Sequence, residues 1–188
     1  MIKKFLLLPV VMLSACTPGP STLVAYFSLS GPTYTPDGII SLEKGNTQAF
    51  AEQIVEYAGA DLFRIETVEP YTGDFEAICA IADKEKENNA RPALKADVDI
   101  DGYDTIYLGW PCWCGTMPMC VLTFLESHDF SGKTIIPFGT HEGSGFGNGL
   151  EDLRKACPDA KIAEGMEIPG HLVLESGEKI RDFVEKNR

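Results

Sequence analysis

The sequence predicts a doubly wound α/β domain, in which a five-stranded parallel β-sheet lies between two layers of helices. Short runs of apolar and β-branched residues alternate along the chain with stretches whose apolar residues recur at helical spacing. The run at 133–139 is apolar almost throughout, as expected of a central parallel strand that is buried on both faces. Together these patterns predict a three-layer sandwich.

The strands are predicted from compact apolar runs. The first reads Thr-Leu-Val-Ala-Tyr-Phe, the second contains Leu62, Phe63 and Ile65, and the third reads Asp-Thr-Ile-Tyr-Leu-Gly. The fifth is short. The predicted strands are 22–27, 61–68, 104–109, 133–139 and 161–164.

The helices are predicted from apolar residues that share one face. Phe50, Ile54 and Tyr57 form such a face, and the stretch at 118–127 repeats the pattern. Pro92 closes the second helical region. The predicted helices are 47–57, 76–89, 118–127, 148–156 and 175–187.

Composition is that of one ordinary globular domain. The chain has 188 residues, of which 44% are apolar and 23% are charged. The formal net charge of -12 argues against nucleic acid as a partner, because phosphate backbones are bound by basic surfaces. Two interpretations of this acidity remain open: attraction of basic partners, or solubility alone.

The N-terminus has the pattern of an export signal. Lys3 and Lys4 precede an apolar run at 5–13, which is too short to span a membrane. The tetrad Leu-Ser-Ala-Cys that ends at Cys16 resembles the lipobox of bacterial lipoproteins, which implies cleavage before Cys16 and a diacylglycerol on its sulfur. There are two alternatives: an ordinary signal peptide that contains a cysteine by chance, or a buried first strand of the domain.

These features predict three regions: a lipoprotein signal peptide at 1–15, a tether at 16–21 and the folded domain at 22–188. The protein would then be exported and held on a bacterial membrane by its lipid. Six cysteines are present, so lipidation of Cys16 leaves five. This odd number indicates a few thiols with room for one bridge rather than a disulfide framework.

A ligand site is expected beyond the carboxyl ends of the strands, where the order of strands in such sheets reverses. After the first strand, Ser28 and Ser30 precede Gly45-Asn46-Thr47 at a helix start. Hydroxyl groups and free amides there would bind a phosphate, and the helix dipole would add to the attraction. A helix cap without any ligand explains Gly-Asn-Thr equally well.

The loops after the third and fourth strands are also unusual. The loop at 109–118 carries two tryptophans among Gly and Pro residues, and Trp113 is the better candidate for stacking on a planar ligand, whereas Trp110 suits the end of the core. The loop at 140–148 is rich in glycine, which allows the backbone to approach a flat molecule closely. His141 in this loop is either a proton donor or a structural residue.

These segments resemble the flavodoxin-like family, and in particular its small flavoproteins. The resemblance extends from about residue 23 to the last helix and is concentrated in the three loops. It is carried by Tyr26-Phe27-Ser28, Gly45-Asn46-Thr47, Gly59 to Phe63, Pro111 to Pro118, Phe124-Leu125-Glu126, Asp129 to Pro137 and Thr140 to Gly147.

The resemblance implies a strand order of 2-1-3-4-5 and a bound FMN at the sheet edge. The phosphate would lie at the first loop and the isoalloxazine ring between the loop of Trp113 and the segment from Thr140 to Phe146. The residues that the resemblance assigns to FMN are Ser28, Ser30, Gly45, Asn46, Thr47, Pro111, Cys112, Trp113, Cys114, Gly115, Thr140, His141, Glu142, Gly143, Ser144 and Gly145.

The chain departs from the family pattern at three places. Residues 32–44 interrupt the phosphate loop, and we expect them to form a hairpin-like excursion over the site. Cys114 replaces the second tryptophan of the family's Trp-Trp-Gly. The fourth loop lacks the tyrosine that often stacks on the flavin, and Phe146 is the candidate substitute.

Three thiols, Cys112, Cys114 and Cys120, gather in the third loop and the helix start that follows. A helix N-terminus lowers the pKa of a nearby thiol, so a redox-active pair is one interpretation. Burial as small apolar side chains is the favoured alternative. A metal site is not expected, because the spacing is tight and no histidine lies near in the sequence.

The predicted function is electron transfer through FMN, with a redox partner protein or a small electron acceptor. The sequence leaves open whether the protein is a carrier or an enzyme of the quinone- or disulfide-reductase type. A flavin-free binding module anchored at the surface is the alternative from another class.

Overall fold

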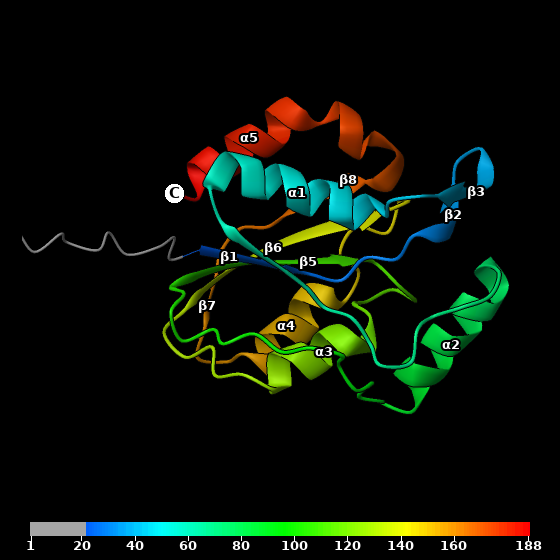
Figure 1. The fold of residues 1–188 in the computed structure, drawn as a ribbon, viewed down its shortest axis with the longest axis horizontal. Coiled ribbons are helices and arrows are strands. Elements are labelled where there is room, and N and C mark those ends of the chain that lie inside the picture. The colour runs from blue at the N-terminus through cyan, green and yellow to red at the C-terminus, as the bar shows by residue number, and fades with distance from the viewer. Residues whose placement is uncertain (1–21) are drawn as a thin grey trace, which may run out of the picture.

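The structure is a computed structural model that describes residues 22–188. The predicted signal peptide, the tether and Cys16 lie outside the described residues. Its main sheet is parallel throughout and has the predicted strand order (Figure 1). Its strands, in spatial order, are β4 (Asp61–Arg64), β1 (Thr22–Tyr26), β5 (Thr105–Pro111) and β6 (Thr134–His141), followed at the edge by β7 (Lys161–Ile162) and β8 (Met166–Pro169).

Two short strands share the fifth position of the sheet. β7 pairs with the start of β6 and β8 pairs with its end, both in parallel. The predicted strand at 161–164 is therefore wrong in its second half, because the chain leaves the sheet between β7 and β8. Gly165 lies in this break, where a Cβ atom would come within 2.6 Å of the Pro137 carbonyl oxygen.

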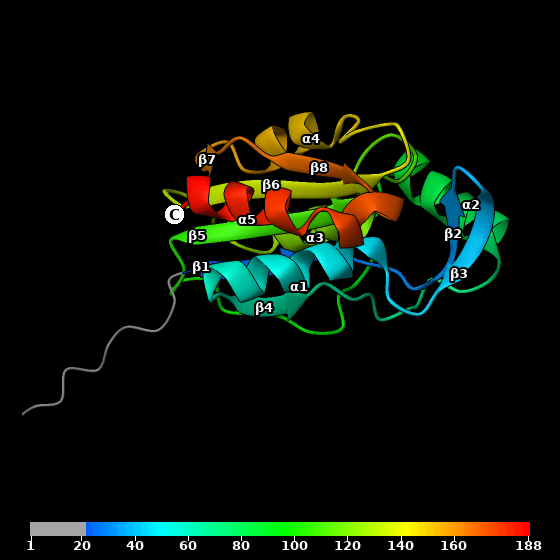
Figure 2. The same ribbon diagram turned by 90° about the horizontal axis from the view of Figure 1, so that it is seen from above.

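Helices cover both faces of the sheet. α1 (Asn46–Ala58) and α5 (Gly177–Lys186) lie on one face, and α3 (Met119–Glu126) and α4 (Gly149–Ala156) lie on the other (Figures 1 and 2). A short 3₁₀ helix, η1 (Gly170–Glu175), precedes α5 and was not predicted.

Side-chain alternation along β1 explains the two hydrophobic cores. Leu23 and Ala25 belong to the core beneath α3 and α4, whereas Val24 and Tyr26 belong to the core beneath α1 and α5. All four side chains are buried, which is the expected state of a strand in the middle of a three-layer sandwich.

The excursion between β1 and α1 is a hairpin outside the main sheet, as predicted. β2 (Gly31–Thr35) and β3 (Gly38–Leu42) pair antiparallel. α2 (Phe75–Glu87) lies beside this hairpin at one end of the sheet and also contacts α3 (Figures 1 and 2). Tyr34 of β2 and Phe75 of α2 bring the two elements into contact, with ring centroids 6.4 Å apart.

Several strand ends differ from the predictions. β4 ends at Arg64 rather than at residue 68, because β1 ends opposite it at Tyr26. β5 and β6 are longer than predicted, so Trp110 and Thr140 belong to strands rather than to loops. Within residues 22–188, no helix has the length and apolar character needed to cross a membrane.

Candidate functional site

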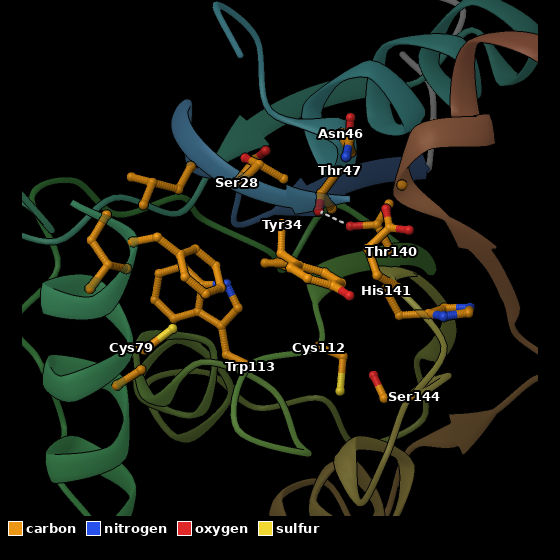
Figure 3. Close-up of a pocket in the computed structure, with 18 of the residues that line it drawn as sticks. Ser28, Tyr34, Asn46, Thr47, Cys79, Cys112, Trp113, Thr140, His141 and Ser144 are labelled. Carbon is orange, nitrogen blue, oxygen red and sulfur yellow. Dashed lines mark hydrogen bonds between the residues drawn. The ribbon is translucent and has the colours of Figure 1, made fainter. Parts of the chain in front are cut away.

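A cavity of about 320 Å³ lies at the carboxyl edge of the sheet, where the segments after β1, β5 and β6 meet (Figure 3). This is the position at which ligands bind in doubly wound sheets. Its lining residues are Ser28, Leu29, Pro32, Thr33, Tyr34, Asn46, Thr47, Phe75, Ile78, Cys79, Ala82, Pro111, Cys112, Trp113, Cys114, Thr140, His141, Glu142, Ser144 and Gly170.

The hairpin leaves the two halves of the first loop in contact. A Cβ atom on Gly45 would lie 2.3 Å from the Leu29 carbonyl oxygen and 2.3 Å from Ser28 Oγ. Gly45 has an ordinary backbone conformation, with φ of -66°. Only glycine fits here, because the two backbone segments approach so closely. As a result, Ser28 and the start of α1 (Gly45, Asn46 and Thr47) form one continuous surface, which we call the cradle.

Donors at the start of α1 face this cradle. The N-cap residue of α1 is Gly45, which has no side chain that could cap the helix. Ser28 Oγ accepts a hydrogen bond from the Gln48 amide at 3.1 Å. The other amides of the first turn are left for an anion, which the helix dipole also attracts. Asn46 and Thr47 therefore line the cavity instead of capping their own helix.

A buried hydrogen bond joins α1 to the central sheet. Thr47 Oγ1 and Thr140 Oγ1 are 2.7 Å apart, and both residues are almost fully buried (Figure 3). The bond fixes the start of the helix against the end of β6. Ser30, by contrast, is exposed and lies outside the cavity lining.

No lysine or arginine is among the described residues that line the cavity. Arg64, at the end of β4, lies behind the lining: its guanidinium donates a hydrogen bond of 3.2 Å to the Ser28 carbonyl oxygen. An anion in the cradle would therefore be bound by neutral hydroxyls, amides and the helix dipole. Arg64 supports the loop from behind, a role that sequence analysis missed.

Trp113 forms the wall opposite α1. Its ring makes edge-to-face contacts with Phe27, at 5.2 Å between centroids, and with Tyr71, at 5.1 Å. Its backbone exchanges two hydrogen bonds with Thr116, of 2.8 and 2.9 Å, across a tight turn. Trp110, in contrast, is completely buried in the core, as its position at the end of a strand suggested.

Hydrogen bonds within the loop and to η1 hold the end of β6 and the segment that follows it. His141 Nδ1 accepts the Gly143 amide at 2.8 Å, which assigns the proton of the neutral ring to Nε2. Glu142 accepts hydrogen bonds from His171, whose amide is 3.0 Å and whose Nδ1 is 2.6 Å from the carboxylate. Glu142 is thus anchored to η1, and its side chain is 14% exposed.

Phe146 does not replace the missing flavin-stacking tyrosine. Its ring is buried in the core and packs against Trp110, with centroids 5.3 Å apart. Its amide donates to Glu167 at 2.9 Å, which draws the chain away from the cavity. The expectation for Phe146 is therefore wrong, because the glycine-rich turn folds back onto the sheet before this residue.

Tyr34 and one face of α2 complete the cavity, and sequence analysis did not assign them to it. Tyr34 of the hairpin projects into the site (Figure 3). Residues of α2 at helical spacing line the apolar end of the cavity, whereas the sequence predicted this helix without assigning it to the site. These α2 residues are Phe75, Ile78, Cys79 and Ala82.

The thiols divide into two groups. Cys79, Cys112 and Cys114 line the cavity, whereas Cys120 is fully buried in the core. Burial raises the pKa of Cys114 to about 12, with a further contribution from the Asp83 carboxylate, and burial raises the pKa of Cys120 to about 12. A lowered pKa at this helix start is therefore wrong, because burial outweighs the helix dipole. All five cysteines of the described chain are free thiols.

Most of the sequence-assigned residues meet at this one cavity, and five do not line it. Those on the lining are Ser28, Asn46, Thr47, Pro111, Cys112, Trp113, Cys114, Thr140, His141, Glu142 and Ser144. Those off the lining are Ser30, Gly45, Gly115, Gly143 and Gly145. The glycines shape the backbone instead; Gly115, Gly143 and Gly145 all have positive φ.

The fold and the site define a doubly wound α/β protein with an anion cradle and an aromatic wall at the switch point of its sheet. The sequence profile of the Flavodoxin family matches residues 21–187, and the chain belongs to this family. A search of curated proteins finds no match.

Solved structures of flavoproteins are similar to this chain. A candidate flavoprotein of Bacteroides uniformis is 30% identical, with 89% of this chain and 99% of that chain covered and a TM-score of 0.72. One of Bacteroides eggerthii is also 30% identical, covers 85% of this chain and 96% of its own, and has a TM-score of 0.65. A flavoprotein of Lactobacillus acidophilus in complex with FMN is 21% identical, with 82% and 96% covered and a TM-score of 0.62.

Proposed function

We propose that this protein binds FMN in the cavity and transfers electrons through it. The observation that carries the proposal is the close approach of Gly45 to Ser28 and Leu29, which joins Ser28 and the start of α1 into a phosphate cradle opposite Trp113. The polar cradle suits a phosphate, and the aromatic wall suits a planar ring. FMN joins these two chemical groups in one molecule.

Each wall has a distinct task in this proposal. Ser28, Asn46 and Thr47 hold the phosphate, Trp113 flanks the ring, and Tyr34 of the hairpin covers the cavity. When bound, FMN supplies one- and two-electron redox chemistry, and the protein supplies orientation and electrostatics. The absence of lysine and arginine from the described lining leaves negative charge near the ring uncompensated, so we expect a low reduction potential.

Flavin titration of the purified protein, kept in detergent, tests the proposal directly. We expect saturable quenching of FMN fluorescence at one FMN per chain and a yellow protein. A colourless protein that leaves FMN fluorescence unchanged would contradict the proposal. It would favour the flavin-free binding module, for which the exposed Ile39 and Ile40 of the hairpin offer an apolar surface.

The hairpin favours a small-molecule acceptor over a bare electron carrier. Tyr34 is half exposed and covers the cavity together with Phe75, so the ring would lie beneath a partial roof. A carrier would instead expose the flavin edge to its protein partner. Steady-state turnover of a quinone or a small disulfide with a reduced nicotinamide donor separates the two, since a pure carrier would show none.

We also propose export and lipid anchoring at Cys16, on the strength of the N-terminal sequence pattern alone. Expression of the full chain in a bacterium fed a labelled fatty acid should label the protein. The Cys16→Ser variant should lose the label and leave the membrane fraction. Equal labelling of both proteins would contradict the proposal.

A further inference from the structure

Three thiols line the cavity, and the proposed electron transfer uses none of them. Cys79 comes from α2, while Cys112 and Cys114 come from the segment after β5. They are brought together from two separate elements, so their proximity is a property of the fold and not of one sequence motif. Figure 3 shows Cys79 beside Trp113, on the α2 side of the cavity.

One face of α2 runs along Cys114. Lys86 Nζ donates a hydrogen bond of 2.5 Å to the Cys114 carbonyl oxygen. Cys79, Asp83 and Lys86 are separated by four and three residues, which places them in a row on one face of a helix. Beyond the effect of burial, Asp83 and Cys79 both add to the raised pKa of the Cys114 thiol, so this face of α2 lies beside Cys114, and both thiols line the same cavity.

The backbone of Cys114 is in an unusual conformation. Its φ is +50°, in the left-handed region that residues with a Cβ atom seldom adopt. Gly115, the next residue, also has a positive φ, so the turn contains two successive left-handed residues. A turn of this kind is easiest with glycine or asparagine, so Cys114 occupies a conformation that is costly for a residue with a Cβ atom.

Nearby carboxylates oppose ionisation of both thiols. Burial is the largest cause of the raised pKa of Cys114, about 12, and the Asp83 carboxylate is the second cause. Burial also raises the pKa of Cys79, followed by the carboxylates of Asp83 and Glu76. Lys86 acts in the opposite direction at Cys114. The thiolate is the attacking species in exchange, so both thiols should react slowly at neutral pH, and the disulfide that they form should be a weak oxidant.

We propose that Cys79 and Cys114 form a reversible disulfide by exchange with a small-molecule disulfide such as glutathione disulfide. One protein thiolate breaks the S–S bond of glutathione disulfide, forming a mixed disulfide and releasing one glutathione. The second protein thiolate then displaces the other glutathione and closes the Cys79–Cys114 bond. Two protein thiols are thus oxidised to one disulfide, and one glutathione disulfide is reduced. The two protons of the protein thiols end up on the two glutathione molecules that are released.

The cross-link would join α2 to the turn that carries Trp113. It would fix the apolar end of the cavity and alter the space left for a second molecule beside the flavin. The exchange needs no flavin, so the protein without FMN can be used, and the outcome does not depend on whether the proposed FMN site is correct.

Mass spectrometry after incubation in glutathione redox buffers tests the pairing. We expect the intact protein to lose the mass of two hydrogen atoms, and non-reducing digestion to yield a peptide pair that joins Cys79 to Cys114. Cys79→Ser and Cys114→Ser should each abolish the loss, whereas Cys157→Ser, which removes a buried thiol outside the cavity, should keep it. A Cys112–Cys114 bond, a persistent mixed disulfide or no change in mass would overturn the proposal.

The shared carboxylate offers a second, kinetic test. Asp83→Asn removes a negative charge that opposes ionisation, and the rate of disulfide formation at neutral pH should rise roughly three-fold for each unit by which the pKa values fall. Glu87→Gln removes an exposed carboxylate from the same helix and serves as the control. Equal rates for the two variants would contradict the proposed effect of Asp83 on the two thiols.

Discussion

The cavity has two walls of different construction. The α1 wall comprises Ser28, Gly45, Asn46, Thr47 and Thr140, and it is tied into the central sheet. The α2 wall comprises Tyr34, Phe75, Ile78, Cys79 and Ala82, and it is built from an inserted hairpin and an outlying helix. The first is polar and rigidly connected, whereas the second is apolar and more exposed.

This difference separates two proposed tasks: the α1 wall binds FMN, and the α2 wall determines which other molecules the cavity accepts. The α1 wall offers hydroxyls and amides fixed by buried contacts, so it can hold an anion without rearrangement. The α2 wall depends on few contacts with the sheet, and such regions open at low free-energy cost. Substitutions in the α1 wall should therefore change FMN affinity and stability together, and those in the α2 wall should mainly change what else the cavity accepts.

The largest effect is expected for Gly45→Val. The added side chain would meet the Leu29 backbone oxygen and Ser28 Oγ, and a backbone atom cannot rotate aside. We expect FMN affinity to fall by about 100-fold or more and the free energy of unfolding to fall by about 1–3 kcal/mol. Fluorescence titration and urea unfolding measure the two quantities. Gly102→Val, at a position with open space around it, is the control and should leave FMN affinity unchanged.

Thr47→Val should have the next largest effect. It keeps the side-chain shape but leaves the buried Thr140 hydroxyl without its partner, which should lower the free energy of unfolding by about 1–2 kcal/mol. Loss of the hydroxyl should weaken FMN binding by about ten-fold. In the double variant Thr47→Val/Thr140→Val, stability should partly return while affinity stays low. Full recovery of affinity would show that Thr47 serves the fold alone.

Trp113→Leu tests the aromatic wall that faces the α1 wall. We expect FMN binding to weaken about five-fold, because one stacked aromatic pair contributes about 1 kcal/mol. The free energy of unfolding should also fall, because the ring contacts Phe27 and Tyr71, but only modestly, since Trp113 is partly exposed. Trp110→Leu is the matched variant: it lies in the core and should lower the free energy of unfolding by several times as much. If Trp110→Leu weakened FMN binding more than Trp113→Leu did, the assignment of Trp113 to the ring and Trp110 to the core would be wrong.

The smallest effect on FMN is expected for Tyr34→Ala. The residue is half exposed and belongs to the α2 wall, so FMN affinity should fall about two-fold or less. The KM for a quinone acceptor should change by more than this. Ile39→Ala, on the same hairpin but outside the cavity lining, should change neither. A ten-fold loss of FMN affinity in Tyr34→Ala would show that the hairpin is part of the flavin site itself.

The α1 wall was predictable because its signals are local. Glycine, small hydroxyl residues and a helix start follow an apolar strand, and the rule for ligand position in such sheets selects that loop. The hairpin could also be expected from the long interruption at 32–44. What sequence could not supply was the contact of Gly45 with Leu29, which depends on two segments separated by the whole hairpin.

The α2 wall was missed for a physical reason. The apolar face of α2 has the same periodicity as a helix packed on the sheet, and sequence alone does not say which surface covers it. Likewise, Phe146 has a loop position in sequence, yet its ring turns into the core beside Trp110. The fifth strand was placed correctly at its start, and its interruption depends on the fit of Gly165 against Pro137 and Phe146.

The divided strand at the sheet margin also bears on self-association. A long, straight outer strand presents unpaired amides and carbonyls on which a second chain can add, which leads to aggregates. Here one margin consists of β7 and β8 with a break between them, and the other is β4, with four residues. Neither edge offers a long, unbroken strand, so edge-to-edge association of two main sheets should be disfavoured even at high protein concentration. Self-association should instead begin at the β2–β3 hairpin, which exposes Ile39 and Ile40.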